Sequence, residues 1–310
     1  MFFRNRKHVV CLQSEDGFRQ IDALVQNGMR VGLLDGSMPE EQLEYLRGEV
    51  MAVFRQRNTP LGLMLRLRPQ DQLTALNLYQ YILLDGFTCG EASCFIEMHR
   101  SETEAMWLLQ TPDTLDDVDD LIQGVMTNDA KLAVDAREKQ LLVMTCTENI
   151  PSDALLWPAG VQAEALSAIQ DHSCWETGYE LNCCDVAEPY DMDTVTGRMA
   201  ALYAQGCSAK AVLLFTTDCK NLAAVSCLYP PVPIIAVAER PKGEAMLLRQ
   251  TLRWGTLPTA ISNVQQEPQR AEEFARYIAG LYGCKPGDRI VAAGHWIAGE
   301  NSHNIYCFTL

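Results

Sequence analysis

The chain has 310 residues, of which 48% are hydrophobic and 21% are charged, a composition typical of a packed globular protein. Its formal net charge of −15 disfavours general binding of nucleic acid or of an anionic membrane, because phosphate groups require clustered cations. The apolar runs are far shorter than the roughly 20 residues that cross a bilayer. No apolar stretch follows the charged N-terminal residues, so neither a membrane span nor a secretory signal is predicted.

The 12 cysteines lie largely in apolar patterns, and no C-x-x-C pair occurs. A free cysteine packs as a small hydrophobic residue, so we expect reduced thiols in a cytoplasmic protein. The 5 histidines form no short-spaced pattern with a cysteine pair, and a structural zinc site is therefore not expected.

The N-terminal third of the chain alternates between predicted strands and predicted helices. Strands at 8–12, 30–34 and 60–67 are separated by helices at 17–26 and 40–55. Consecutive strand–helix units of this kind are typical of a parallel barrel or of an open parallel sheet.

The middle of the chain is less regular. Residues 83–86 and 141–145 resemble strand ends, and residues 114–124 are predicted to form a helix.

The C-terminal third predicts one α/β domain with a mostly parallel sheet and helices on both faces. The last strand is expected to run antiparallel to its neighbour. The expected strands are 211–215, 234–238, 255–261, 289–293 and 305–309, and the expected helices are 193–206, 218–228, 243–252 and 269–282.

Common catalytic and phosphate-binding motifs are missing from the sequence. Neither G-x-x-x-x-G-K-[ST] nor G-x-G-x-x-G occurs, and there is no G-x-S-x-G or H-E-x-x-H. The function must therefore be sought in less general patterns.

Several segments resemble the pyruvate kinase family. Residues 27–38, NGMRVGLLDGSM, are similar to the family segment AGMNVARLNFSH. AVLLFTT at 211–217, YPPVPIIAV at 229–237 and GDRIV at 287–291 resemble motifs of the family's C-terminal domain in order and spacing. The resemblance covers about three-fifths of the chain.

The resemblance implies an α/β protein with a TIM-barrel domain followed by a pyruvate kinase C-terminal-type α/β sheet domain. We place the first over residues 1–180 and the second over 181–310. A complete barrel of eight strand–helix units takes about 250 residues. We therefore expect a partial or trimmed barrel, and we expect the family's inserted lid domain to be absent.

In the family, Mg²⁺, K⁺, an arginine and a lysine transfer phosphate from phosphoenolpyruvate to ADP, a step of glycolysis. The resemblance puts Leu33 at the position of the phosphate-binding arginine. Asp35 and Ser37 stand at potassium-ligating positions, and Arg66 places a positive charge where the family has a cation-binding aspartate.

Three further positions follow from weaker similarities. Leu108 stands at the position of the catalytic lysine, and Gln110 stands at that of the magnesium-binding glutamate. Thr145 corresponds to the family's strand-end threonine. The catalytic set is therefore vestigial, and no catalytic residue is expected to be intact.

The family's effector turn corresponds here to a segment that leads into a predicted helix, whose N-terminus suits an anion. Asp218 would repel a phosphate, so this is a weak candidate site. Its candidate ligand-binding residues are Thr216, Thr217, Lys220 and Asn221.

Three interpretations remain open. The first is a catalytically degenerate paralogue that needs no cofactor and acts through interaction or regulation, as a homo-oligomer or with an active pyruvate kinase. The second is an active pyruvate kinase with Mg²⁺ and K⁺, which needs metal ligands such as Glu97, Asp113 and Asp129. The third is a module that binds a small metabolite in the crevice of the C-terminal domain.

Overall fold

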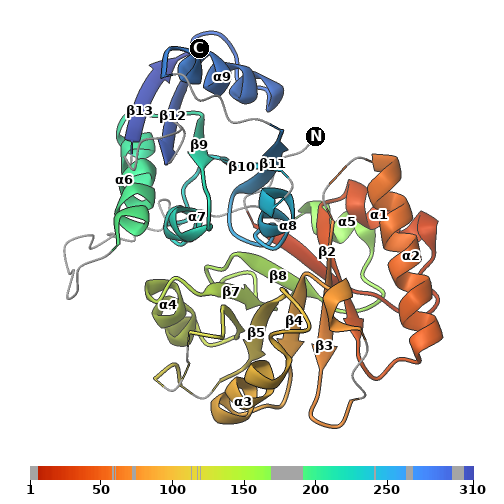
Figure 1. Cartoon of the computed structure of the whole chain (residues 1–310). Coiled ribbons are helices and arrows are strands. Elements are labelled where there is room, and N and C mark those ends of the chain that lie inside the picture. The colour runs from red at the N-terminus through yellow and green to blue at the C-terminus, as the bar shows by residue number, and fades with distance from the viewer. Residues whose placement is uncertain are drawn as a thin grey trace. The chain divides into compact units, whose positions relative to one another are not determined.

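Two separate β-sheets organise the chain, one in residues Met1–Asp171 and one in residues His172–Leu310 (Figure 1). The predicted boundary between residues 180 and 181 lies outside the described residues. The computed structural model describes residues 6–57, 59, 61–71, 75–112, 114–116, 118, 120–168, 191–240, 242–262, 268–294 and 304–310.

The N-terminal unit is a closed barrel of eight parallel strands, in which β1 pairs with both β2 and β8. The expectation of an incomplete barrel is therefore wrong. The strands are β1 (Lys7–Cys11), β2 (Met29–Asp35), β3 (Gly62–Leu67), β4 (Tyr81–Leu84), β5 (Met106–Gln110), β6 (Gly124–Met126), β7 (Leu142–Thr145) and β8 (Ala154–Trp157).

The barrel closes within a short chain because its connections are reduced. Among the described residues, no helix connects β5 to β6 or β7 to β8, and the predicted helix over 114–124 is wrong. The helical elements of the unit are α1 (Phe18–Gln26), α2 (Glu40–Arg57), the 3₁₀ turn η1 (Leu76–Leu78), α3 (Cys89–His99), α4 (Ala130–Glu138) and α5 (Ala163–Ala168).

The connection from β3 to β4 comprises residues 68–80 and contains η1. An inserted domain needs at least about 50 residues. This connection is therefore too short to hold a lid domain.

Side chains alternate along each strand between the barrel interior and the surrounding helices. In β3, Leu63, Leu65 and Leu67 belong to the apolar cluster that includes residues of α1 and α2. Met64 and Arg66 therefore lie on the opposite face, toward the barrel interior. This alternation decides which side chains reach the mouth of the barrel.

The C-terminal unit has a five-stranded sheet in the order β11-β10-β9-β12-β13. It confirms the five predicted strands, including the antiparallel pairing of the last one. The strands are β9 (Ala211–Phe215), β10 (Ile234–Glu239), β11 (Thr256–Ile261), β12 (Arg289–Gly294) and β13 (Asn304–Thr309).

Helices cover both faces of this sheet. Val212 and Leu214 pack in a cluster with residues of α6, α7 and α8, whereas Leu213 and Phe215 pack with residues of α9. No helix in the described part of the chain is long and apolar enough to cross a membrane. The helices are α6 (Met192–Gly206), α7 (Lys220–Ser226), α8 (Lys242–Leu248) and α9 (Pro268–Leu281).

Helices α6 and α7 approach closely at Gly197. A Cβ atom added there would lie 2.3 Å from the carbonyl oxygen of Asn221 and 2.9 Å from the Cβ of Ala224. Gly206, at the end of the same helix, has open space around the corresponding position. The lack of a side chain at Gly197 therefore sets the separation of the two helices.

We expect Gly197→Ala to lower the free energy of unfolding by about 3 kcal/mol, since backbone must move to admit the methyl group. Gly206→Ala is the matched control, which should leave the free energy of unfolding unchanged or raise it by up to about 1 kcal/mol. Urea titrations followed by circular dichroism measure both changes. Equal effects of the two substitutions would contradict this account of the helix packing.

Candidate functional site

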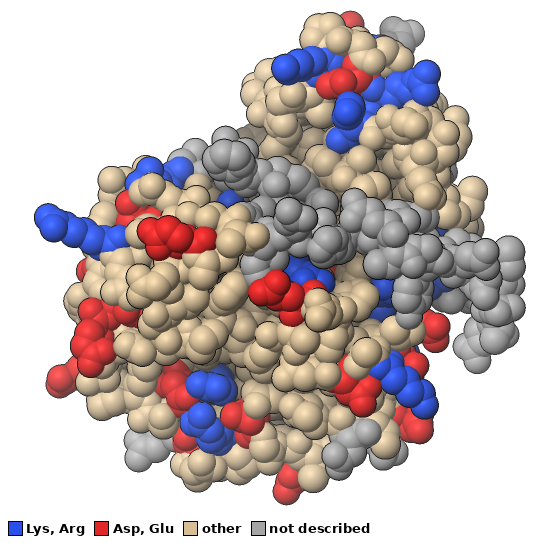
Figure 2. All heavy atoms as spheres, turned by 180° about the vertical axis from the view of Figure 1, so that it is seen from behind, with Lys and Arg blue, Asp and Glu red and all other residues tan. Residues whose placement is uncertain are grey.

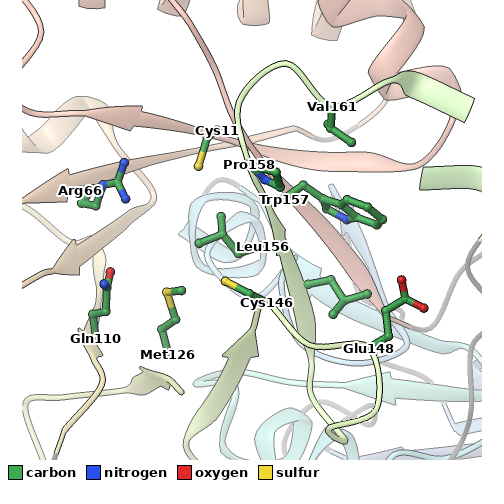
Figure 3. Close-up of a pocket in the computed structure, with 11 residues that line it drawn as sticks. Cys11, Arg66, Gln110, Met126, Cys146, Glu148, Leu156, Trp157, Pro158 and Val161 are labelled. Carbon is green, nitrogen blue, oxygen red and sulfur yellow. The ribbon is translucent and has the colours of Figure 1, made fainter. Parts of the chain in front are cut away.

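The carboxyl ends of the barrel strands surround a pocket of about 590 Å³ (Figure 3). Ligands of parallel barrels bind at this end, because the loops that follow the strands meet there. The pocket is lined by Cys11, Arg66, Gln110, Met126, Cys146, Glu148, Leu155, Leu156, Trp157, Pro158 and Val161.

The pocket combines a few polar groups with apolar walls. Figure 3 shows Arg66, Gln110, Met126 and Cys146 directed toward one another from different strand ends. Arg66 belongs to β3, Gln110 ends β5 and Met126 ends β6, while Cys146 directly follows β7. A pocket of this size and composition suits a small molecule with an apolar body.

Asp35 and Arg66 form an ion pair beside this pocket. They are Cα partners in the parallel pairing of β2 and β3, so their side chains project on the same face of the sheet. The Nη2 and Nε atoms of Arg66 lie 2.7 and 3.1 Å from Oδ2 of Asp35. The strand register therefore dictates the pair.

Arg68 adds a second guanidinium to the same carboxylate. Its Nη1 donates to Oδ1 of Asp35 at 2.8 Å, and its Nη2 donates to Oδ2 at 3.0 Å. The hydroxyl and backbone N–H of Ser37 donate to Oδ1 at 2.7 and 3.1 Å. Each oxygen of Asp35 thus accepts three hydrogen bonds, one of which in each case comes from Arg68.

These contacts fix the ionisation state of Asp35. Partial burial raises the pKa of the carboxyl group, but the hydrogen bonds from Arg68 and Ser37 and the charge of Arg66 outweigh it, so the pKa lies well below its usual range. In return, the hydrogen bond to Asp35 raises the pKa of the Arg68 guanidinium. The group is a permanent ion cluster near neutral pH.

The cluster extends to two more carboxylates. Arg68 approaches Asp85 at 3.4 Å and Asp71 at 4.0 Å. Three carboxylates therefore surround two guanidinium groups, which leaves no excess positive charge for a phosphate. Acidic side chains are also spread, with basic ones among them, over the face shown in Figure 2.

Gln110 brings an unsatisfied polar atom to the pocket. Its Oε1 is buried and has no hydrogen-bond partner among the described residues. A buried carbonyl oxygen without a partner costs about 1–3 kcal/mol, and a ligand that donates a hydrogen bond would recover part of this. Gln110 is therefore suited to recognise a hydroxyl or amino group.

The two thiols in the pocket wall are not activated nucleophiles. Partial desolvation by neighbouring groups raises the pKa of Cys11 and of Cys146, although the Cys146 side chain is exposed, while the charge of Arg66 opposes this in both. A thiol whose pKa is raised is protonated near neutral pH, and the thiolate is the reactive form. These cysteines act as apolar wall residues.

The positions expected to replace the arginine and lysine of the family lie below the pocket. Leu33 is 1% exposed and Leu108 is 0% exposed, and neither lines the pocket. Leu33 pairs with Met64 in β3, and Leu108 pairs with Leu83 in β4. Both leucines are packing residues of the barrel interior.

Thr145 ends β7, as expected for a strand-end threonine. Its hydroxyl group donates to Oδ1 of Asn128 at 2.9 Å, and it accepts from the backbone N–H of Thr147. The side chain is fully buried and does not line the pocket. Thr145 thus fastens the loop after β6 to the loop after β7.

Of the three candidate magnesium ligands, the two that the structure describes have other structural partners and do not line the pocket. Glu97 lies on α3 and pairs with Arg100, and Asp129 caps the N-terminus of α4. Asp113 lies outside the described residues. Among the residues that the structure describes, no group of three His, Cys, Asp or Glu side chains could hold a metal ion.

The candidate effector turn of the C-terminal unit is closed by its own hydrogen bonds. The hydroxyl of Thr216 accepts from the backbone N–H of Cys219, and Asn221 donates to the carbonyl of Phe215. Lys220 is exposed and lies 3.9 Å from Asp218.

Thr217 is exposed at the same turn, and the helix that follows, α7, has only 7 residues. The four candidate residues are close in sequence: Thr216, Thr217, Lys220 and Asn221. Their polar groups do not converge on a common anion-binding position.

Sequence reasoning missed most of the residues that define the mouth of the barrel. Arg68 could have been found, because residues two apart in extended backbone share a face and Arg68 directly follows β3, two residues after Arg66. No sequence pattern marks the apolar residues that line the pocket, such as Cys11, Cys146 and Trp157, because they look like any other core residue in the sequence.

The comparisons with known proteins give no family. No family model matches the chain, and the search of curated proteins finds no significant match. The function must therefore be inferred from the residues and the site.

The residues at the mouth do not fit a K⁺ and Mg²⁺ site of the kind that the resemblance implies. Both oxygens of Asp35 are engaged by guanidinium groups, which a monovalent cation would have to displace. Gln110, which the resemblance aligns with the magnesium-binding glutamate, is a neutral amide, whereas Mg²⁺ prefers charged oxygen ligands.

We expect Asp35→Asn to lower the free energy of unfolding by about 2 kcal/mol, after allowance for partial exposure, because two guanidinium groups lose their carboxylate. Asp22→Asn is the matched control, since the Asp22 side chain is about as exposed as that of Asp35 but accepts hydrogen bonds from one guanidinium only, that of Arg57. The Asp22→Asn variant should lose much less unfolding free energy in urea titrations. Equal losses would show that the second guanidinium adds nothing to the Asp35 cluster.

The depressed pKa of Asp35 also predicts a pH dependence. The stabilisation is present above the unfolded-state pKa of about 3.9 and is lost as the pH falls toward the lower folded-state pKa. The difference in unfolding free energy between wild type and Asp35→Asn should therefore shrink from about pH 5 to about pH 3. A difference that stays constant over this range would refute the assignment.

Proposed function

We propose that the chain is a pyruvate kinase-like protein without phosphoryl-transfer activity, which acts as an interaction or regulatory protein. The single observation that carries this proposal is the saturation of Asp35 by Arg66, Arg68 and Ser37. A carboxylate at the end of β2 that would help to concentrate cations is instead neutralised from within the chain.

The rest of the mouth supports the same conclusion. Transfer of a phosphoryl group depends mainly on positive charge aimed at the moving oxygens. Gln110 and Met126 end β5 and β6 with neutral side chains, and Leu33 and Leu108 are buried below. Several contributions to the rate, each typically worth orders of magnitude, are therefore missing together.

The test is pyruvate release from phosphoenolpyruvate and ADP with Mg²⁺ and K⁺. We expect the wild type to release no more pyruvate than an Asp35→Ala, Ser37→Ala double variant. Because loss of Asp35 destabilises the barrel, Ser37→Ala alone is assayed beside it, with circular dichroism of all samples. Turnover in the wild type that both variants lose would overturn the proposal and support an active pyruvate kinase.

A second candidate function is binding of a small molecule in the barrel mouth rather than in the crevice of the C-terminal domain. The pocket of about 590 Å³ favours it. Nη1 of Arg66 has no hydrogen-bond partner in the described part of the chain, and the Oε1 of Gln110 has none either. This donor and this acceptor stand among mostly apolar residues of the described lining, with Glu148 as its one carboxylate, which suits an amphipathic ligand.

We expect the fluorescent probe Nile red, a neutral aromatic molecule, to bind the wild-type protein and to lose most of its fluorescence enhancement in Cys146→Trp. The indole would fill the pocket that Cys146 lines. Cys94→Trp is the control, because Cys94 is also exposed but lies on α3 outside the pocket wall. An equal enhancement in both variants would place the probe elsewhere.

A further inference from the structure

The sulfur atoms of Cys207 and Cys307 lie 3.6 Å apart in the C-terminal unit, although the two residues are one hundred positions apart in the chain. Cys207 caps the C-terminus of α6, directly after its last residue, and Cys307 lies in β13, at the edge of the sheet. Two sulfur atoms in contact need only a small side-chain rotation to reach bonding distance.

The two cysteines occupy the same side of the sheet. Both are partly buried hydrophobic neighbours of the cluster that α6 and α7 form with the sheet. Cys307 is the Cα partner of Val291, which belongs to this cluster. Packing of α6 against β12 and β13 therefore holds the pair together in the folded protein.

The setting also allows a reagent to reach the pair. Both cysteines are half-buried, unlike Cys219, which is buried and whose pKa is raised to about 12 by burial. A partly exposed thiol is accessible to small oxidants, whereas a buried one is inert.

A cation lies beside the pair. The Nη1 atom of Arg289 donates to the carbonyl oxygen of Cys207 at 2.9 Å. Burial and the neighbouring Cys207 raise the pKa of Cys307, and the Arg289 charge opposes this increase. The pKa of Cys307 nevertheless stays above the usual value of a thiol, so the thiolate that reacts with an oxidant is a minor fraction near neutral pH and grows as the pH rises.

We propose that Cys207 and Cys307 are a modification site, at which a peroxide converts the two thiols into an intramolecular disulfide that thiol reductants reverse. In the first step one thiolate attacks hydrogen peroxide, the O–O bond breaks, and a sulfenic acid and hydroxide form. The second thiolate then attacks the sulfenic sulfur, the S–S bond forms and hydroxide leaves. Two thiols and one peroxide thus yield one disulfide and two waters.

The disulfide would tie the edge strand to the sheet's covering helix. Among the strands that the structure describes, β13 pairs with β12 alone, so its other edge has no partner among them. A covalent link from β13 to the end of α6 closes a loop of one hundred residues, and long loops gain the most from such a link. Oxidation should therefore stabilise the C-terminal unit.

The experiment treats the full chain with hydrogen peroxide and compares the products before and after reduction. Peptide mapping without reductant should show one peptide pair that joins Cys207 to Cys307. The melting temperature of the C-terminal unit should rise by about 5–10 °C and should return on reduction.

Three variants separate this pair from general thiol chemistry. Cys207→Ser and Cys307→Ser should each abolish both the linked peptide and the thermal shift. Cys284→Ser is the matched control, because Cys284 is half-buried in the same unit and packs on the opposite face of the sheet. It should behave as the wild type does.

Two results would overturn the proposal. One is a peroxide-treated protein with sulfinic acid or no modification at these cysteines. The other is a thermal shift that persists in Cys207→Ser or Cys307→Ser.

Discussion

The ion cluster at the ends of β2 and β3 is the constraint on which the proposed function depends. Asp35 and Arg66 are neighbours because the parallel register makes them Cα partners, and Arg68 joins them because it follows two residues later. The cluster is partly buried, so removing the carboxylate would leave two guanidinium groups without their partner. The charged groups at the mouth of the barrel therefore pair with one another instead of with a ligand.

The rest of the barrel is also poorly suited to binding highly charged ligands. The interior below the cluster is filled by leucines and methionines, and the connections between strands are short. The remaining space is a pocket with mostly apolar walls, whose polar lining residues are Arg66, Gln110 and Glu148. Such a mouth suits binding by shape and a few hydrogen bonds better than chemistry on highly charged phosphates.

The fold was predictable where each strand is a separate apolar run. Residues 211–215 and 234–238 are such runs, bounded by turn residues, and both are strands. The strands β6 and β8 have only 3 and 4 residues, and β6 follows a connection that lacks a helix in its described residues. Strands this short show neither a clear hydrophobic periodicity nor an apolar run of typical strand length. The closed barrel was therefore not predicted.

The site was less predictable than the fold. Asp35, Ser37 and Arg66 were singled out by resemblance, and they do meet at one place. Their meeting depends on the register between two strands that are 31 residues apart at these positions, which no local pattern encodes. The same holds for Cys207 and Cys307, whose contact depends on how a helix packs against an edge strand.

The most direct test of the central claim is the carboxyl ¹³C resonance of Asp35, followed by NMR during titrations with K⁺ and with Mg²⁺ plus phosphoenolpyruvate. The account predicts a resonance of an ionised carboxylate that neither titration moves, because guanidinium groups already engage both oxygens. A saturable shift on addition of K⁺, enhanced by phosphoenolpyruvate, would contradict it and would show that Asp35 is a cation ligand.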